Sequence, residues 1–209
     1  MEISRFIVNI FEENTYIIWD KDTLEAAIVD PGMKRSHEEE KIDQFIQQHN
    51  LSVKMILLTH AHLDHTFGVA HAQEVYGAEV LANKEDEQLL AGVDSQARMF
   101  HLPYRLEPLK IDRYISHGDI ITLGKEEIKV LYVPGHSRGS VAYYVPSAGF
   151  VLTGDVLFRM GIGRTDLPGG SQAVLLRSIR EQLLTLPPDT IVYPGHGDAT
   201  TIGAEAARF

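Results

Sequence analysis

The sequence predicts an α+β fold in which helices cover β-sheets, and two observations support this class. Several stretches rich in β-branched and aromatic residues, which predict strands, follow one another along the chain, and stretches that predict helices lie between and after them. In addition, segments 55–60 and 191–196 are both apolar strands that end on a histidine. Two similar sheet layers packed face to face would bring these two ends to a shared edge. A single domain spanning residues 1–209 is sufficient for this arrangement.

The first half of the chain alternates strands with helices. The strand expected at Val53–Leu58 ends in the continuous apolar run 55–58, which indicates a strand covered on both faces. Ser36 can cap a helix whose acidic first turn suits the helix dipole, and Gly77 can end the next helix. Strands are expected at Ile3–Phe11, Thr15–Trp19, Ala26–Val29, Val53–Leu58 and Glu79–Ala82. Helices are expected at Ser36–Asn50, Asp64–Tyr76 and Lys84–Leu90.

The second half begins after residues 91–118, which carry no clear pattern and are expected to form an irregular surface excursion. A glycine-rich loop is expected at Gly161–Gly170, followed by a helix at Gln172–Leu184. Strands are expected within Ile120–Val133 and at Val141–Val145, Phe150–Thr153 and Ile191–Tyr193.

Composition limits the function classes. The 209 residues are 44% hydrophobic and 23% charged, which is ordinary for a globular chain and excludes intrinsic disorder. There is no cysteine, so disulfides, thiolate metal sites and a cysteine nucleophile are excluded. The net charge of −10 disfavours nucleic acid and anionic membranes as partners, because phosphate binding requires a basic face.

Three histidines and an aspartate fall within six residues of the segment His60-Ala61-His62-Leu63-Asp64-His65, directly after an apolar strand. Side chains two apart in an extended segment point the same way, so His60 and His62 can bind one ion. Asp64 and His65 lie where the chain turns into the next helix and face a second position. The helix dipole keeps Asp64 ionised. The cluster therefore predicts metal binding.

Three later motifs add ligand types, and each follows an apolar strand and small residues. His136 lies in Pro134-Gly135-His136, Asp155 in Thr153-Gly154-Asp155 and His196 in Pro194-Gly195-His196. Glycine lets the backbone turn sharply at such positions. Together with the first cluster these motifs give five histidines and two aspartates, which is enough for two metal sites.

The run His60-x-His62-x-Asp64-His65, followed by His136, Asp155 and His196, resembles the metallo-β-lactamase superfamily, and the match extends from Asp30 to His196. The resemblance implies a four-layer αββα sandwich with metals at one edge. Within the superfamily the chain looks most like the short, single-domain members of the glyoxalase II branch. Only 13 residues follow His196, so the carboxy-terminal helical domain of full-length glyoxalase II is not expected.

The resemblance also implies the role of each ligand. One metal would be held by His60, His62 and His136, the second by Asp64, His65 and His196, with Asp155 bridging them. Two divalent ions are expected, zinc first, with iron or manganese as alternatives because all three accept nitrogen and carboxylate ligands. Asp30 either orients a ligand histidine or serves as a turn residue before Pro31.

The implied reaction is hydrolysis of a small-molecule thioester, such as S-lactoylglutathione, by a metal-bridging hydroxide. In this branch the catalytic residue is Asp64, which orients the hydroxide and handles its proton. Arg164 matches a basic residue of the glyoxalase II substrate loop and is the candidate for binding a substrate carboxylate. The alternative for Arg164 is a salt bridge to Asp166.

Arg164-Thr165-Asp166 also resembles the persulfide dioxygenases of the same superfamily. Their single iron is held by two histidines and one carboxylate, here His60, His136 and Asp155 by position. This oxygen chemistry is the alternative function. A non-catalytic binding protein is disfavoured because all seven ligand-type residues are retained.

The amino-terminal segment lacks the pattern of a signal peptide, and no apolar run approaches the roughly 20 residues that span a bilayer. A cytoplasmic protein without a membrane partner is therefore expected. This placement and the second-site pair Asp64-His65 disfavour β-lactam hydrolysis. Arg138 stands where relatives often have proline, and nothing in the sequence explains it.

Overall fold

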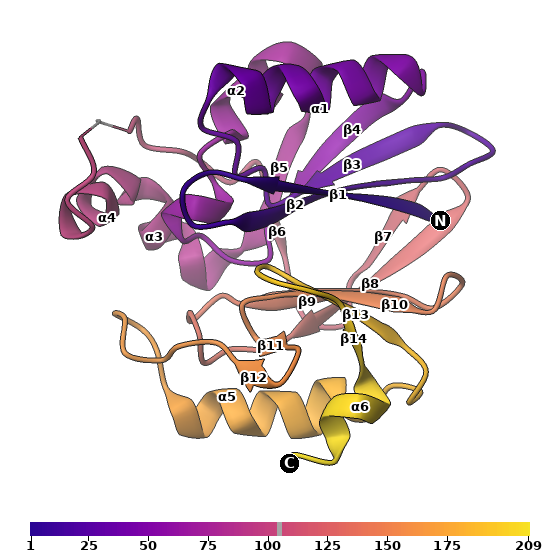
Figure 1. Cartoon of the computed structure of the whole chain (residues 1–209), viewed down its shortest axis with the longest axis vertical. Coiled ribbons are helices and arrows are strands. Elements are labelled where there is room, and N and C mark those ends of the chain that lie inside the picture. Colours follow the sequence, from indigo (N-terminus) through magenta and orange to yellow (C-terminus); the bar gives the residue numbers. More distant parts are fainter. Residues whose placement is uncertain (104–105) are drawn as a thin grey trace.

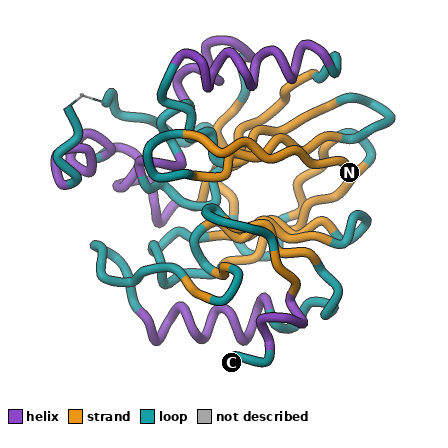
Figure 2. Tube along the Cα trace, viewed as in Figure 1, coloured by secondary structure: helices purple, strands orange, loops and turns teal. Residues whose placement is uncertain are grey.

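Two six-stranded β-sheets lie face to face, with helices on their outer sides (Figure 1). The computed structural model describes residues 1–103 and 106–209. The four layers are distinct in Figure 2, where helices lie beyond both sheets. The predicted αββα sandwich is therefore confirmed. None of the helices in the two described ranges is long and apolar enough to cross a membrane.

In spatial order the first sheet consists of β1 Glu2–Val8, β2 Glu13–Trp19, β3 Glu25–Val29, β4 Ser52–Leu57, β5 Glu79–Asn83 and β6 Arg113–Ile115. The second sheet, also in spatial order, consists of β14 Thr200–Thr201, β13 Ile191–Pro194, β10 Phe150–Gly154, β9 Val141–Val145, β8 Glu126–Tyr132 and β7 Ile120–Leu123. A two-stranded hairpin is formed by β11 Leu157–Phe158 and β12 Gly161–Ile162.

The helices are α1 Ser36–Gln48, α2 Val69–Tyr76, α3 Glu87–Ala91, α4 Val93–Met99, α5 Gln172–Ser178 and α6 Ile202–Ala206. Short helical turns are η1 Leu63–His65, η2 Lys84–Asp86 and η3 Ile179–Leu183. Helices α1 and α2 cover the first sheet, and α5 and α6 cover the second (Figure 1). Helices α3 and α4 project beside the sandwich at the edge that carries the site described below (Figure 1).

Strand alternation explains how the sequence fills three apolar layers. Ile17 and Ile18 are neighbours in β2 and both are fully buried. Ile17 packs in the cluster shared with α1 and α2, whereas Ile18 packs between the two sheets. On the far side, Leu175 of α5 packs against Val151 of β10. Successive residues of a strand face opposite sides, so both sheets are covered on both faces.

The helix expected over Asp64–Tyr76 is interrupted, which corrects that prediction. Residues 63–65 form the short turn η1, and α2 begins only at Val69. The Thr66 hydroxyl donates to the carbonyl oxygens of His62 and Leu63, at 3.3 and 3.1 Å. Such side-chain bonds compete with helix propagation. The predicted end of the helix holds, because Gly77 follows α2 in the left-handed region with φ 64°.

Other boundaries also differ from the prediction. Ser36 is the first residue of α1 rather than its cap, and the Glu38 carboxylate accepts from the backbone N–H groups of Lys34 and Arg35 instead. The stretch 91–118, expected to be irregular, contains α4 and β6, and its residues 104 and 105 lie outside the described part. The predicted loop 161–170 begins with β12, and the carboxy-terminal β14 and α6 were not predicted.

Candidate metal centre

All seven candidate ligands follow the ends of strands that meet at one edge of the sandwich. The segment 60–65 follows β4, His136 follows β8, Asp155 follows β10 and His196 follows β13. Strands β8, β10 and β13 run in the same direction, since β9 is antiparallel to β8 and β10 and β13 is parallel to β10. Their carboxyl ends therefore lie together.

Glycine is required at position 154, where β10 ends directly before Asp155. Gly154 has φ 49°, and a Cβ there would lie 2.2 Å from the Thr59 hydroxyl oxygen. The end of β10 can therefore approach the segment that precedes His60 only if residue 154 has no side chain. This close approach brings ligand candidates from the two sheets together.

The first group consists of His60, His62 and His136, all buried. The Nε2 atom of His136 lies 2.8 Å from Nδ1 of His62 and 3.2 Å from Nε2 of His60. Three imidazole nitrogens that converge in this way can donate their lone pairs to one cation. The structure thus brings together the three residues assigned to one metal.

The second group consists of Asp64, His65 and His196. The Asp64 Oδ2 atom lies 3.3 Å from Nε2 of His196 and 3.8 Å from Nε2 of His65. These residues come from η1 and from the loop after β13, which are more than 130 positions apart in the sequence. The second predicted group is thus also assembled.

Asp155 lies between the two groups. Its Oδ1 atom is 3.4 Å from Nε2 of His65. Its Oδ2 atom is 3.6 Å from Nε2 of His136 and 3.6 Å from Nε2 of His196. One carboxylate therefore faces a histidine of the first group and two histidines of the second.

A second set of contacts fixes the orientation of four imidazole rings. In each ring Nδ1 contacts an oxygen, which leaves Nε2 facing the centre. The contacts are Thr59 Oγ1 for His60 at 3.1 Å, Asp30 Oδ2 for His65 at 3.0 Å, the Arg164 carbonyl for His136 at 2.8 Å and the Phe11 carbonyl for His196 at 3.0 Å. Partners of this kind are typical of metal-binding histidines, because they fix the tautomer and the ring plane.

Burial and neighbouring charges set the protonation of these groups. Burial, together with the other histidines, lowers the pKa of His60 far below its ordinary value. Burial and His136 lower the pKa of His62 to about 3. Burial would raise the pKa of Asp155, but the neighbouring His65, His136 and His196 outweigh it and lower that pKa. The neutral imidazoles of His60 and His62 and the ionised carboxylate of Asp155 are the forms that bind cations. Burial would lower the pKa of His65, but Asp155 and Asp64 outweigh burial and raise it.

The donor set also fits a cation because two of its atoms lack partners. His65 Nε2 and Asp155 Oδ1 are buried and make no hydrogen bond. An unpaired buried polar atom is costly unless something satisfies it. A cation held by His65, Asp64 and His196 next to Asp155 would satisfy both atoms.

The structure also shows buried residues that the sequence analysis did not identify. Glu13 is fully buried; its Oε2 accepts from the Thr15 hydroxyl at 2.8 Å, and burial raises its pKa well above the ordinary value. Its Oε1 lies 3.8 Å from Nδ1 of His65. The only signal in the sequence is an acidic residue shortly before the apolar end of a strand.

Two further residues brace the ligand loops. Asp86 accepts from the Ala61 and Gly139 backbone N–H groups at 3.1 and 2.7 Å and from the Ser137 hydroxyl at 2.6 Å. It thus joins the loop that carries His60 and His62 to the loop that carries His136. Gln96 accepts from Leu63 N–H at 3.0 Å. No local sequence pattern marks either role, because the partners are distant along the chain.

Arg164 lies at the wall of the cavity beside the centre, and its side chain is half exposed. Its guanidinium forms two hydrogen bonds with Asp166, at 2.8 and 2.7 Å. The salt bridge that the sequence analysis offered as an alternative is therefore present. The cavity measures about 190 Å³ and is also lined by Phe11, Asp64 and Asp155.

Comparison with known proteins agrees with this geometry. Residues 9–196 match the family described as the metallo-beta-lactamase superfamily. The chain is 39% identical over 207 residues to the hydroxyacylglutathione hydrolase GloC of Haemophilus influenzae, covering 98% of this chain and 95% of the relative. It is 38% identical over 205 residues to the probable metallo-hydrolase YqgX of Bacillus subtilis, covering 98% and 94%.

Solved structures are similar over nearly the whole chain. BLEG-1, a B3 metallo-beta-lactamase, has a TM-score of 0.89 at 33% identity and covers 99% of this chain and 97% of its own. TTHA1623 in a di-iron-bound form has a TM-score of 0.86 at 37% identity, covering 97% and 96%. ETHE1 from Myxococcus xanthus has a TM-score of 0.78 at 27% identity, covering 98% and 81%.

The fold, the assembled cluster of histidines and aspartates and these similarities agree with one another. The cluster indicates a site for divalent metal ions, and the two relatives named above are a hydrolase and a probable metallo-hydrolase by name. The chain belongs to the metallo-beta-lactamase superfamily.

Proposed function

We propose that this protein is a thioester hydrolase of the glyoxalase II type that uses two divalent metal ions. The observation that carries the proposal is the position of Asp155 between two complete ligand groups. A single metal site would need only one of these groups. The similarity to a hydroxyacylglutathione hydrolase at 39% identity supports the same reaction class.

In this proposal one ion binds to the His60 group and the other to the Asp64 group, with Asp155 shared. Bound divalent cations would acidify water from a pKa of 15.7 toward about 7 and polarise a carbonyl group. Zinc is the first expectation, and iron and manganese suit the same donors. The di-iron-bound form of a relative at 37% identity keeps iron among the candidates.

The residues around the cavity orient the reactants. Asp64 is the proposed catalytic residue, because its side chain is partly exposed to the cavity and its Oδ2 atom lies 3.3 Å from His196 Nε2. Burial would raise the pKa of Asp64, but the neighbouring His65 and His196 outweigh burial and lower it. The ionised Oδ2 can orient a water molecule and accept its proton. Phe11 and Leu63 form an apolar part of the cavity wall and limit the access of bulk water to the centre.

The substrate in this proposal is a small-molecule thioester, with S-lactoylglutathione as the first compound to test. Arg164 remains the proposed contact for a substrate carboxylate. Asp166 occupies the edge of the guanidinium formed by Nε and Nη2, so a substrate carboxylate would bind the remaining N–H groups or displace Asp166. A cytoplasmic location, a single domain and the lack of a nucleic-acid or membrane partner remain predictions from the sequence.

The test combines metal analysis with two activity assays on the purified protein. We expect two metal ions per chain and hydrolysis of S-lactoylglutathione or another thioester. One iron per chain with oxygen consumption on a persulfide, and no thioester hydrolysis, would overturn the proposal. A β-lactam substrate measured in parallel separates thioester hydrolysis from the activity named for BLEG-1.

The variant Asp155→Ala tests the role of the shared carboxylate. We expect loss of activity together with loss of bound metal, because both groups lose a ligand. The matched variant Asp166→Ala removes the exposed carboxylate that pairs with Arg164, which belongs to neither ligand group, and should keep its metal. An inactive Asp155→Ala protein that still binds two metal ions would contradict this role.

The second candidate function is that of a persulfide dioxygenase. The segment Arg164-Thr165-Asp166 favours it, and these residues form an ordered pair at the wall of the cavity. This function would use His60, His136 and Asp155 and would leave the second group without a role. For this reason the thioester hydrolase is the stronger candidate.

A further inference from the structure

Three neighbouring cavities form a row that starts at the metal centre, and each shares wall residues with the next; we refer to this row as the groove. The cavity at the centre shares His62, Phe100 and Leu167 with a second cavity of about 330 Å³. The second cavity shares Gln88, Leu89 and Pro168 with a third, also of about 330 Å³. Volumes of this size lie at the lower end of the roughly 300–1,000 Å³ that is typical of small-molecule sites.

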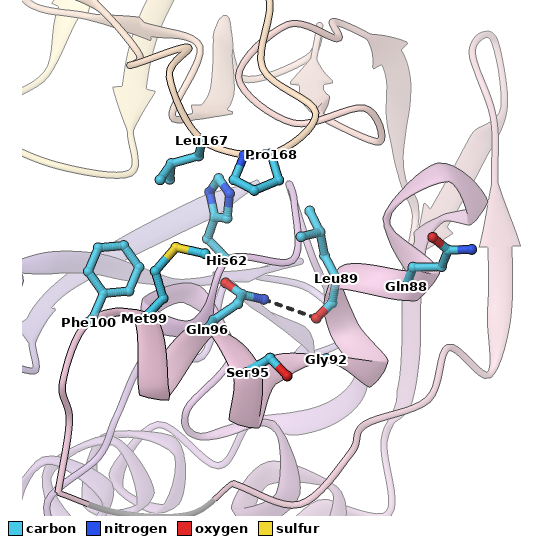
Figure 3. Close-up of a pocket in the computed structure, with 10 residues that line it drawn as sticks. All are labelled: His62, Gln88, Leu89, Gly92, Ser95, Gln96, Met99, Phe100, Leu167 and Pro168. Atoms are coloured by element: carbon cyan, nitrogen blue, oxygen red, sulfur yellow. Dashed lines mark hydrogen bonds between the residues drawn. The ribbon is translucent and has the colours of Figure 1, made fainter.

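The middle of the groove is apolar. Figure 3 shows Leu167 and Pro168 facing α3 and α4 across the pocket, with the His62 imidazole between them. Leu89, Met99 and Phe100 supply the opposite wall, and 54% of the Met99 side chain is exposed. The Gln96 side-chain amide does not face outward, because it donates to the carbonyl oxygens of Ala61 and Leu89. The wall therefore offers an extended group little hydrogen bonding.

The far end of the groove carries the exposed cation Arg138. Within the described residues its guanidinium forms no ion pair, although the acidic residues Glu85 and Asp86 line the same cavity. Both Asp86 oxygens are already bonded, to Ala61, Ser137 and Gly139. The Arg138 guanidinium thus remains available at the end of an apolar channel.

The backbone around Arg138 is held in place from both sides. The Arg138 carbonyl accepts from the Tyr132 hydroxyl at 2.8 Å, and the N–H of Gly139 donates to Asp86 at 2.7 Å. The aliphatic stem of Arg138 also lies close to Gly169. Arg138 follows the ligand His136 by two positions. Its position is therefore fixed relative to the metal centre by the same loop.

We propose that one arm of the substrate thioester lies along this groove, and that this arm is apolar and ends in an anion bound by Arg138. The inference rests on the proposed function, because it places the thioester group at the metal centre. With a net charge of −10 the protein repels anions at long range, so binding of an anionic end needs a local cation. A short polar arm would leave the apolar wall and Arg138 without contacts. This arrangement favours a carrier or acyl group other than those of S-lactoylglutathione.

The test uses the metal-loaded enzyme and matched pairs of thioesters that differ only at the end of one arm. The acyl pair is the hexanoyl and adipoyl thioesters of N-acetylcysteamine. The thiol pair is the acetyl thioesters of hexanethiol and 6-mercaptohexanoate. In each pair we compare kcat/KM for the anionic and the neutral compound. The responding pair identifies which arm, acyl or thiol, occupies the groove.

We expect one pair to favour its anionic member about fivefold, the upper range for an exposed charge pair. Arg138→Gln should bring this ratio close to one, and Glu85→Gln should raise it. Arg180→Gln, which removes an exposed arginine from the outer helical layer, should leave the ratio unchanged. Met99→Asn should lower kcat/KM for both members of the responding pair. If Arg138→Gln changes neither ratio, the proposal is wrong.

A binding measurement separates this inference from the proposed function. The fluorescent probes 8-anilino-1-naphthalenesulfonate and N-phenyl-1-naphthylamine differ only by the sulfonate. Arg138→Gln should weaken binding of the sulfonate about fivefold more than binding of the neutral probe. If this shift is found but no thioester is hydrolysed, the groove is supported and the proposed function fails. If thioesters are hydrolysed but Arg138→Gln changes neither substrate ratio, the groove proposal fails alone, whatever the probes show.

Discussion

A single buried carboxylate, that of Asp30, connects the end of β3 to the metal centre. Its Oδ1 accepts from the Thr59 backbone N–H at 2.7 Å and its Oδ2 from the Thr59 hydroxyl at 2.6 Å. Oδ2 also lies 3.0 Å from Nδ1 of His65. Asp30 has φ 50°, so it is a turn residue as well as a contact of a ligand histidine. The two roles offered by the sequence are both present.

Asp30→Asn should therefore weaken metal binding at the His65 group. Asparagine keeps the size of the side chain but replaces one acceptor oxygen with a donor, so it cannot hold both Thr59 and the ring as before. A loss of about 10- to 100-fold in metal affinity is expected, as is typical for partners of ligand histidines. Competition with a chelating dye measures this affinity. Asp112→Asn, which alters a carboxylate bonded to the Val80 N–H, serves as the control. Equal affinities in the two variants would assign Asp30 to the turn alone.

At the scale of elements, the start of α1 depends on Glu38. Its carboxylate accepts from the backbone N–H groups of Asn9, Lys34 and Arg35, at 2.9, 2.9 and 3.0 Å. Burial alone would raise the pKa of Glu38, but these three donors outweigh burial and lower it. One side chain thus joins the start of α1 to Asn9, which follows β1 and whose side-chain amide donates to the Asp64 carbonyl oxygen.

Glu38→Gln should destabilise the protein by about 1–2 kcal/mol at pH 7, as expected for a lost cap or charged hydrogen bond. Because the pKa is lower in the folded state, the stabilisation is complete above the unfolded value of about 4.3 and is lost as the pH falls through the folded pKa. Urea unfolding of both proteins at pH 7 and pH 3 measures this difference. Glu40→Gln, on the exposed side of the same helix, should show no such dependence. A difference that persists undiminished at pH 3 would contradict the assignment.

The hairpin of β11 and β12 positions two ligands through a glycine. A Cβ at Gly163 would lie 1.8 Å from the carbonyl oxygen of Asp155 and 3.1 Å from Nδ1 of His136. Gly161→Ala is the matched control in the same hairpin, since a Cβ there meets nothing within 4 Å.

Gly163→Ala should abolish activity and lower metal content, because the backbone at Asp155 must move to remove the overlap. The Gly161→Ala protein should keep at least half of the wild-type activity. Circular dichroism and metal analysis of both variants show whether the folded state persists. Full activity in Gly163→Ala would show that the hairpin is free to shift without disturbing the ligands.

At the scale of the whole molecule, the centre joins the two sheets. His60, His62, Asp64 and His65 follow a strand of the first sheet, and the other three ligands follow strands of the second. The Asn14 N–H also donates to the Gly195 carbonyl at 2.7 Å, which adds a direct link between the sheets. Ions held by both groups would therefore connect the two halves of the sandwich.

Removal of metal by a chelator should lower the melting temperature of the protein. A ligand that binds only the folded state stabilises it by about 2.7 kcal/mol at 100 times its Kd. Calorimetry before and after chelation, and after metal is restored, measures the effect. Asp155→Ala should show a smaller shift because it binds less metal. A melting temperature unaffected by chelation in a protein shown to lose its metal would mean that the centre does not stabilise the fold.

Much of this architecture follows from local patterns. The spacing of His60 and His62 in an extended segment predicts that they face one position, and the structure places their ring centres 4.8 Å apart. The apolar run predicts that the end of β4 is buried on both faces, and this is observed for Met55, Ile56 and Leu57, whereas Lys54 is exposed. Alternation and strand ends are properties of neighbouring residues, so they are visible in the sequence.

Other features escape such patterns. The residues next to Asp86 in the sequence do not indicate that it joins two ligand loops. The residues next to Arg138 do not indicate that it lies at the end of the groove. The interruption of the helix after Asp64 also depends on a hydroxyl that competes for backbone carbonyls. The contacts of Asp86 and Arg138 form between segments whose separation in space is set by the packing of both sheets, whereas the hydroxyl contact is local but has no pattern that marks it.

The sequence by itself determined the layered fold and the seven candidate ligands, because each follows an apolar strand. The resemblance also implied how those ligands divide into two groups around Asp155, but only the tertiary structure decided which side chains orient them and where the groove leads. The physical reason is that strand formation depends on neighbouring residues. A shared carboxylate and a continuous groove exist only once two sheets have packed and brought distant loops to one edge.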